Sequence, residues 1–402
     1  MWCLGFYKHH AKIKMYSSYL LSIIIPTRNR QSVLLQSLQQ IMKVINGKVQ
    51  IVIQDNSDNE SLRDDLSKLK YCNIKYNYTK ERLSFVDNFD IATSLADGQY
   101  LCMIGDDDGV CEEIVKVVEW AAKNNYDSII PNVDFEYFWP NSIKLYGMES
   151  RGIARILQSK PKIRKIDAEK GVINVLKNGC QNYMKYDVVK LYHGIVKKDC
   201  IEKVHNIAGK YFGGVSPDIY ISIALSLVCK SNFRIMMPLT IAGVCKKSGS
   251  ADSSNGKHIG TYNAMPHLNG HIDYVWSDLV PKFYSVESVW ADSAIKAIED
   301  MKRQDLLKYY NFAAFDAICK LNYGDYTKWI DKTSVAYPLK NKSLVITKEK
   351  IKHYMRRVFW RLSRLGKKLL IQNDLKDLNV AYEFYRSSSR NDIKDIVDKI
   401  KE

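Results

Sequence analysis

The chain has 402 residues and a mass of 46.4 kDa, enough for a large core and two or three structural units. Its composition, 46% hydrophobic and 26% charged, excludes collagen-like, low-complexity and disulfide-stapled miniprotein classes. The net charge of +16 favours partners that carry phosphate: nucleic acid, anionic lipid or a nucleotide substrate. Nine cysteines without a CxxC pair indicate neither a zinc knuckle nor a disulfide framework, and predict a reducing compartment such as the cytoplasm.

The N-terminal residues 1–19 carry mixed basic and aromatic side chains without the apolar centre or cleavage site of a secretory signal. We therefore expect a disordered leader, with Met15 as an alternative start. The longest apolar run nearby, Tyr19–Pro26, is far shorter than the ~20 residues that a membrane span requires, and the sequence predicts no membrane-spanning helix.

Short apolar runs alternate with helical periodicity between residues 20 and 135. Expected strands lie at residues 20–25, 49–53, 100–104 and 128–131, and expected helices at 33–44, 85–95 and 114–122. This alternation is typical of βαβ units, so the sequence predicts an α/β fold: a mainly parallel, Rossmann-like sheet with helices on both faces. Ligands of such sheets bind at the carboxyl ends of the strands.

Two further units are expected. Residues 136–282 have an irregular pattern and should complete the same sheet and supply a pocket wall. Residues 283–402 turn helical and basic: Lys340–Ile371 holds eleven Lys or Arg against one acid, Glu349. Most of the excess positive charge therefore lies near the C-terminus.

Three aspartates, Asp106, Asp107 and Asp108, crowd the turn between the expected strand at 100–104 and the helix that follows. Carboxylates this close resist joint ionisation unless a cation lies among them. A divalent metal ion, Mg²⁺ or Mn²⁺, would meet that need, because such an ion accepts one or two carboxylates and completes its coordination with phosphate and water. Alternatively, one aspartate caps the helix and the others are solvated.

Two other strand ends carry side chains that could bind a nucleotide. Pro26, Thr27, Arg28 and Arg30 follow the first strand, while Asp55 and Asn56 follow the second. A carboxylate and an amide can hydrogen-bond the edge of a uracil-like base, and the arginines suit a diphosphate. The alternative for Asp55 and Asn56 is a simple Asx turn.

Four segments in order, SIIIPTRNR, IVIQDNSDNES, RLSFVDNFDIA with Arg82 and Asn88, and ADGQYLCMIGDDDGV, resemble glycosyltransferase family 2. These are inverting, metal-dependent enzymes with a nucleotide-diphospho-sugar transferase fold, and the nearest resemblance is to bacterial polysaccharide and O-antigen enzymes of the abequosyltransferase type. The resemblance implies that residues 20–135 bind the nucleotide sugar and 136–282 the acceptor. Arg82, Asn88, Asp106 and Asp107 would join the donor site.

The GDDD sequence departs from the family's usual DxDD, which leaves two alignments open. Aligned by strand, Gly105 takes the place of the first aspartate and Asp107 is the metal ligand. Aligned as DxD, Asp106 and Asp108 are the pair. All three aspartates therefore remain candidate metal ligands.

The resemblance also implies a catalytic base at the start of a helix in the second half. Asp218, in GGVSPDIYISIALSL, has this place. An ordinary helix N-terminal acid is the alternative, and Asp199 and Asp187 are weaker competitors. Resembling enzymes often present a histidine or lysine to the diphosphate, which makes His258 a candidate metal or phosphate ligand, although most loop histidines are simply solvated.

Near the C-terminus, apolar residues recur with helical spacing at Ile351, Met355, Val358, Leu362, Leu365 and Leu369, flanked by arginines and lysines. One helix with this pattern suits the surface of an anionic membrane. Equally, the apolar stripe could pack on the catalytic domain and leave its charges in solvent.

Together these features predict transfer of a sugar, with inversion, from a nucleotide diphosphate such as a UDP-sugar. The acceptor would be a hydroxyl of a growing, lipid-linked surface glycan at the inner face of the plasma membrane. A nucleotidyltransferase is a rival, but no glycine-rich phosphate loop follows the first strand. A non-catalytic nucleic-acid binder is a second rival supported only by net charge, and no nucleic-acid partner is expected.

Overall fold

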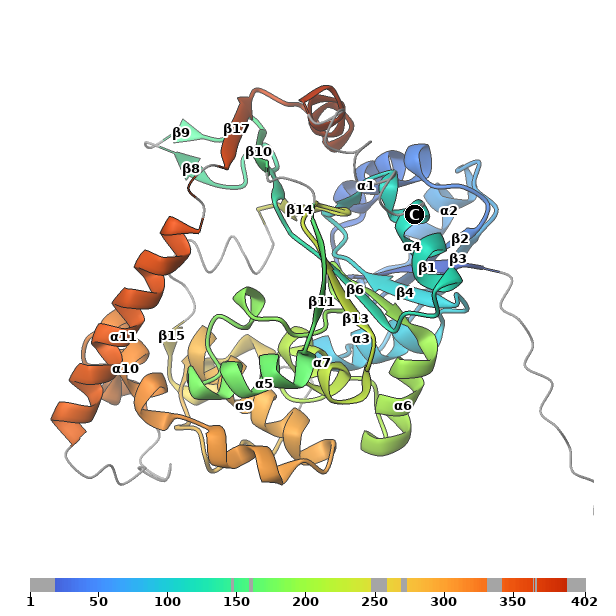
Figure 1. The fold of residues 1–402 in the computed structure, drawn as a ribbon. Helices are drawn as coiled ribbons and strands as arrows, with labels where there is room; N and C mark the ends of the chain where they lie inside the picture. The colour runs from blue at the N-terminus through green and yellow to red at the C-terminus, as the bar shows by residue number, and fades with distance from the viewer. Residues whose placement is uncertain are drawn as a thin grey trace, which may run out of the picture.

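A computed structural model describes residues 19–145, 148–158, 162–246, 259–268, 273–330, 342–363, 365 and 367–388 (Figure 1). Its centre is an eight-stranded sheet in the order β11-β13-β6-β12-β4-β1-β2-β3. The strands are β1 Leu21–Thr27, β2 Val49–Asp55, β3 Ile74–Tyr78, β4 Tyr100–Met103, β6 Ser128–Pro131, β11 Ile163–Ile166, β12 Ile195–Lys197 and β13 Asn232–Ile235. The pairs β4–β1, β1–β2, β2–β3 and β6–β13 are parallel, and the others are antiparallel.

Helices cover both faces of this sheet because its central strands are apolar on both sides. Ile23 and Ile25 of β1 point into one core, whereas Ile24 points into the other. The first core contains the helices α1 Gln31–Val44, α2 Leu62–Ser67 and α4 Glu113–Lys123. The second contains α3 Phe85–Ser94, α5 Ala168–Lys177, α6 Lys198–Ala208, α7 Pro217–Val228 and α9 Val286–Asp300. The predicted α/β class is confirmed.

The strands and helices expected between residues 20 and 135 are all present, but three more elements were not predicted: β3, α2 and the two-residue strand Gly109–Val110. Every residue of β3 is only half-buried, as suits a strand at the sheet edge, so it lacks the continuous apolar run of its neighbours. Helix α2 has only six residues, too few to show a helical period. The expectation that residues beyond 136 complete the same sheet is confirmed, since β11, β12 and β13 belong to it.

A second, five-stranded sheet in the order β17-β10-β7-β14-β5 was not expected. Its strands are β5 Gly109–Val110, β7 Phe135–Phe138, β10 Ile153–Gln158, β14 Thr240–Val244 and β17 Lys368–Asn373. Short β-ladders and 3-10 turns complete the described elements: β8 Lys144–Leu145, β9 Met148–Glu149, β15 Ile259–Gly260, β16 Tyr284–Ser285, η1 Tyr183–Lys185, η2 Tyr262–Ala264, η3 Pro266–Leu268, η4 Gln304–Tyr309 and η5 Tyr326–Trp329. This second sheet matters for function because β5 directly follows the three aspartates.

The C-terminal region is helical only in part. It contains α10 Phe312–Tyr323, α11 Lys342–Leu362 and a helix at residues 378–388, but β17 lies between the last two. The prediction of one helix carrying the apolar stripe to Leu369 is therefore wrong beyond Leu362. The strand forms because β10 offers a free edge, with Ile153 opposite Asn373, and local periodicity cannot reveal such a distant partner.

Residues 1–18, most of the expected leader, lie outside the described residues. Within the part of the chain that the structure describes, no helix combines the length and the apolar character needed to cross a bilayer.

An unusual carboxyl group lies in the first turn of α4. Glu113 is 2% exposed, its carboxyl oxygens make no hydrogen bond to any other described residue, and burial raises its pKa to about 7. Because this folded-state pKa exceeds the unfolded value, the group lowers stability as the pH rises from about 4.5 to about 7.

We therefore expect Glu113→Gln to stabilise the protein at pH 7.5 by about 2–3 kcal/mol and to have little effect at pH 4.5. Denaturant unfolding at both pH values measures this. The control is Glu112→Gln, because the neighbouring Glu112 is only half-buried and its carboxylate lies 3.6 Å from Arg386. An equal change in the free energy of unfolding at both pH values would show that packing, and not ionisation of Glu113, causes the change in stability.

Candidate active site

The carboxyl ends of the neighbouring parallel strands β4, β1 and β2 place their polar side chains along one edge of the sheet. Thr27, the last residue of β1, donates a hydrogen bond from Oγ1 to Asp106 Oδ2 at 2.6 Å. Asp55 ends β2 directly opposite Thr27 in the strand register. Two of the three predicted strand ends are thus joined by a buried hydrogen bond.

Arg30 lies among the aspartates. Its Nη2 is 2.7 Å from Asp106 Oδ1, its Nε donates to Asp106 Oδ2 at 3.0 Å, and its Nη1 is 3.6 Å from Asp107 Oδ1. Burial opposes the charge on Arg30, but attraction by Asp106 and Asp107 outweighs burial and raises its pKa. Part of the positive charge that the sequence argument assigned to a metal ion is therefore supplied by the chain itself.

Backbone N–H groups from β14 and the residue after it hold the other two aspartates. Gly243 N donates to Asp108 Oδ1 at 2.7 Å, and Cys245 N donates to Asp107 Oδ2 at 3.0 Å. Asp108 Oδ2 accepts two more hydrogen bonds, from Gly105 N and the Tyr192 hydroxyl. Asp108 is thus the most firmly held of the three, while Asp107 Oδ1 lies 3.6 Å from Arg30 Nη1 and the Cys245 side chain also interacts with the Asp107 carboxylate.

Burial makes this turn a poor place for negative charge. It raises the pKa of Asp106 to about 7 and that of Asp108 to about 6, and it raises the pKa of Asp107 together with repulsion from Asp108. Arg30 only partly offsets these effects. An additional cation at this edge would therefore be electrostatically favoured.

The glycine that departs from the family pattern has a steric explanation. A Cβ at Gly105 would lie 2.7 Å from the Tyr192 hydroxyl and 3.1 Å from Asp108 Oδ2. The space where an aspartate side chain would begin is therefore filled by the Tyr192–Asp108 pair.

Tyr192 and His193 are residues that the sequence reasoning did not place in the site. His193 Nε2 lies 3.4 Å from Asp108 Oδ2, and Nδ1 lies 2.8 Å from the Thr240 hydroxyl. Burial lowers the pKa of His193 to about 4, so its ring is neutral. The only sequence signal was a histidine next to a tyrosine before a short apolar run, which fits a packed pocket wall equally well.

Asp55 and Asn56 are buried, and their side chains hydrogen-bond to neighbouring residues of β2, β3 and the loops that follow these strands. Asp55 Oδ1 accepts from Ser57 N at 2.9 Å, the Asx turn of the alternative reading, and Oδ2 accepts from the Tyr76 hydroxyl at 3.0 Å. The Asn56 amide donates to two carbonyls of the loop after β3, and its oxygen accepts from Leu83 N at 3.0 Å. Arg28 also reaches Asn56 Oδ1, at 3.3 Å.

Arg82 and Asn88 take different places. Arg82 is exposed in the loop between β3 and α3. Asn88 is buried in α3, where its amide nitrogen lies 3.5 Å from the Thr27 carbonyl and its Oδ1 has no hydrogen-bond partner among the described residues. Asn88 therefore adjoins the Thr27–Asp106 cluster, and Arg82 is free to meet a ligand from solvent.

Asp218 occupies the first turn of α7, as predicted, immediately after Pro217. Burial and the charge of Asp108 raise its pKa to about 6. Its charge in turn helps to raise the pKa of Tyr192, whose hydroxyl donates to Asp108. The charge of the aspartate cluster therefore acts on the protonation of Asp218, although residues 106–108 and 218 are far apart in the sequence.

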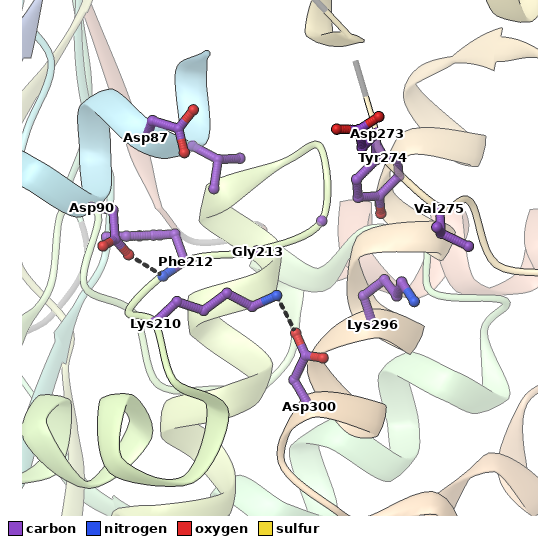
Figure 2. A pocket seen from close by; sticks show the side chains of 12 residues that line it. Asp87, Asp90, Lys210, Phe212, Gly213, Asp273, Tyr274, Val275, Lys296 and Asp300 are labelled. Atoms are coloured by element: carbon purple, nitrogen blue, oxygen red, sulfur yellow. Dashed lines mark hydrogen bonds and ion pairs between the residues drawn. The ribbon is translucent and has the colours of Figure 1, made fainter. Parts of the chain in front are cut away.

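A pocket of about 510 Å³ lies between α3, α9 and the glycine loop before α7 (Figure 2). Its charged lining consists of Asp87, Asp90, Lys210, Asp273, Lys296 and Asp300. Lys210 pairs with Asp300 at 2.9 Å. Asp90 fixes the loop by accepting from the backbone of Tyr211 and Phe212. Gly213 and Gly214 line the pocket a few residues before Asp218.

No group of three or more His, Cys, Asp or Glu side chains within the described ranges is spaced to bind a metal ion. The residues present instead fit a cation held by one or two carboxylates, because Asp106 and Asp108 flank Asp107, whose Oδ1 lies 3.6 Å from Arg30 Nη1. His258 lies outside the described residues.

Residues 22–184 match the model of a family described as glycosyl transferase family 2. The match covers β1 to η1, including the three aspartates, and is less than half of the chain. This segment is therefore a glycosyl transferase family 2 domain, as the sequence resemblance implied. Asp218 lies beyond it.

No curated protein sequence is detectably similar to this chain. Among solved structures, TarS residues 1–349 of S. aureus with UDP-GlcNAc shares 14% identity and a TM-score of 0.44, over 92% of each chain. A mannosyltransferase, PcManGT from Pyrobaculum calidifontis, with GDP-Man and Mn²⁺, shares 12% identity and a TM-score of 0.38, over 84% of this chain and 88% of the other. Likenesses this remote carry no argument about substrate.

Proposed function

We propose that this protein is a glycosyltransferase that moves a sugar, with inversion, from a nucleotide diphosphate to a hydroxyl of a growing glycan. One observation carries the proposal: within a chain containing a family 2 domain, Asp106, Asp107 and Asp108 lie at a sheet edge in the same electrostatic neighbourhood as Asp218. The first group suits a divalent cation that would hold the donor's diphosphate, and Asp218 suits the acceptor's proton.

In this proposal residues 20–135 bind the donor. Arg30 and Arg28 would face the diphosphate, and Arg82 could close on it from the loop before α3. Asp107 would be the main carboxylate ligand of Mg²⁺ or Mn²⁺, which corresponds to the alignment that matches strands. When bound, the cation would neutralise charge on the leaving diphosphate.

The base of the donor would lie near the end of β2. The Asp55 carboxylate is held there by Tyr76 and Ser57, and the hydrogen bonds of Asn56 shape the loop that would frame the base. A uridine-like base fits an acceptor group at this position, because its ring N–H is a donor. We therefore propose a UDP-sugar donor.

Asp218 would act as general base. The acceptor oxygen attacks the anomeric carbon as its proton passes to the Asp218 carboxylate, the bond from that carbon to the diphosphate oxygen breaks, and the nucleoside diphosphate leaves with the electron pair. A single displacement of this kind inverts the anomeric configuration. The half-buried carboxylate, with its pKa of about 6, is ionised at neutral pH yet more basic than an exposed aspartate.

We assign residues 136–282 to the acceptor. The pocket of Figure 2 opens beside the glycine loop that leads to Asp218. Lys210 and Asp273 of this segment line it together with charged residues of α3 and α9, and these carboxylates and lysines can hydrogen-bond sugar hydroxyls. The acceptor is proposed to be a lipid-linked surface glycan of the O-antigen or capsule kind. The enzyme would then work at the inner face of the plasma membrane.

A panel of nucleotide sugars tests this function. With Mg²⁺ or Mn²⁺, we expect the protein to release the nucleoside diphosphate slowly from one donor in the absence of acceptor. Formation of a nucleotide sugar from a sugar phosphate and a nucleoside triphosphate, with release of pyrophosphate, would instead identify a nucleotidyltransferase.

A further inference from the structure

Exposed apolar side chains gather on one part of the molecule. Of the fifteen large hydrophobic residues that are exposed in the described part of the chain, ten lie between Leu344 and Ile371. We call these ten residues the apolar surface: Leu344, Ile351, Tyr354, Met355, Val358, Phe359, Leu362, Leu365, Leu369 and Ile371. Soluble surfaces seldom expose so many such side chains together, and a cluster of this kind marks an interaction site.

The opposite face of α11 accounts for its attachment to the rest of the fold. Ile346 and Glu349 are buried there, and Arg356 donates to Asn178 Oδ1 at 2.6 Å. Trp360 packs edge-on against Tyr186 and beneath the ammonium of Lys185, which lies 3.9 Å from the ring centroid. In Figure 1, α11 runs beside α10 at the margin of the molecule.

The apolar stripe recognised in the sequence therefore faces away from the protein. Ile351, Met355, Val358 and Leu362 are 57%, 66%, 53% and 56% exposed. The alternative in which this stripe packs on the catalytic domain is wrong for these residues. Although β17 is a strand and not a continuation of the helix, its Leu369 and Ile371 are also exposed.

Positive charge surrounds the apolar surface. Exposed basic side chains stand at Lys348, Arg357, Arg361 and Lys368. Glu349, the one acidic residue between 342 and 371, is buried and paired with Lys352 at 2.6 Å, so it contributes no exposed negative charge. An apolar centre with a basic border is complementary to anionic lipid headgroups above an acyl layer.

We propose that the apolar surface of α11 and β17 docks the protein on an anionic lipid bilayer, with the exposed lysines and arginines at the headgroups. Burial of the apolar side chains supplies a salt-independent part of the affinity, and the basic residues supply a salt-sensitive part. Membrane docking itself requires no turnover. Only the reason for it, access to a lipid-linked acceptor, rests on the proposed function.

Flotation of the full chain with vesicles tests the proposal. Vesicles of phosphatidylglycerol and phosphatidylcholine should carry the protein upward, vesicles of phosphatidylcholine alone should carry much less, and added salt should weaken binding to the first kind. Equal flotation with both vesicle types, or none with either, would overturn the proposal. Donor hydrolysis measured in the same samples reports the proposed function separately.

Two double variants separate the electrostatic and the apolar contributions to membrane affinity; the first removes basic residues. Arg357→Glu with Arg361→Glu should reduce partitioning into anionic vesicles by more than about tenfold, at about fivefold per lost charge. The charge-matched control is Lys203→Glu with Lys230→Glu, at exposed positions in α6 and after α7. Equal losses in both would show that only net charge matters and would contradict a defined docking surface.

Met355→Glu with Phe359→Glu should abolish flotation, whereas Ile207→Glu on α6 should not. Because the replaced side chains are exposed, all of these variants should keep the thermal midpoint of the wild type, which confirms that they fold. If Met355→Glu with Phe359→Glu instead dissociates a dimer, as seen by sedimentation, and the wild type binds no vesicles, the surface joins two copies of the chain and the membrane proposal fails.

Discussion

Asp218→Asn should lower kcat by about 10²–10⁴-fold and leave the KM of the donor nearly unchanged. Asparagine has almost the same shape as aspartate but cannot take a proton from the acceptor hydroxyl. Because Asp218 is proposed to touch only the acceptor, donor binding at the Asp106–Asp108 turn should persist. Steady-state kinetics with donor and acceptor varied in turn measure both effects.

Asp199 provides the matched control for this variant. It also lies in the first turn of a helix, α6, but its side chain is half exposed and pairs with Lys197 at 3.5 Å. Asp199→Asn should therefore keep wild-type kinetics. Wild-type kcat in Asp218→Asn on the true acceptor would move the role of base to another residue.

The pH dependence gives an independent check on Asp218. A base must be ionised to act, and burial together with Asp108 places the pKa of Asp218 at about 6 in the free protein. Activity governed by this group should therefore fall about tenfold per pH unit below about pH 6.

Asp107→Ala should cost at least about 10–100-fold in affinity for the divalent cation, which is the loss typical of removing even a residue that only supports a metal ligand, and donor affinity and turnover should fall with it. The expected cause is the loss of the carboxylate oxygen Oδ1, which lies 3.6 Å from Arg30 Nη1. Calorimetric titration of Mn²⁺ with the nucleoside diphosphate present, and assays in excess chelator, measure this. Full activity in chelator would exclude the metal role.

Asp58→Ala is the control for Asp107→Ala. Asp58 belongs to the same edge of the sheet, but its side chain is exposed; it accepts from Asn29 Nδ2 at 3.0 Å and lies 3.4 Å from Arg28 Nη2. A loss confined to Asp107→Ala would assign the effect to the cluster. Equal losses in both variants would mean that general negative charge near the site is enough.

Much of this site could be predicted because its signals are local. Buried strands such as Leu21–Thr27 show as continuous apolar runs, and the rule that ligands bind at strand ends then points to Thr27, Arg30 and the three aspartates. Asp218 was predicted differently: the family resemblance implied a base at the start of a helix, and the glycine loop and Pro217 before an apolar helix marked that place.

The remainder depends on contacts between distant segments. The amides of Gly243 and Cys245 and the hydroxyl of Tyr192 reach the aspartates only because β14 pairs with β5 and because Tyr192 forms a bridge beside Met103. The end of α11 at Leu362 and the start of β17 depend on the free edge of β10 in the same manner. No local period contains that information.

The anomeric configuration of the product tests the central claim most directly. Once the donor is identified, NMR of the product formed on a simple hydroxyl acceptor should show the configuration opposite to that of the donor sugar, with one nucleoside diphosphate released per bond formed. This is the expected result of a single displacement assisted by Asp218 across from the aspartate cluster. Retention of the donor's configuration would contradict the account, because it requires two displacements or attack from the face of the leaving group.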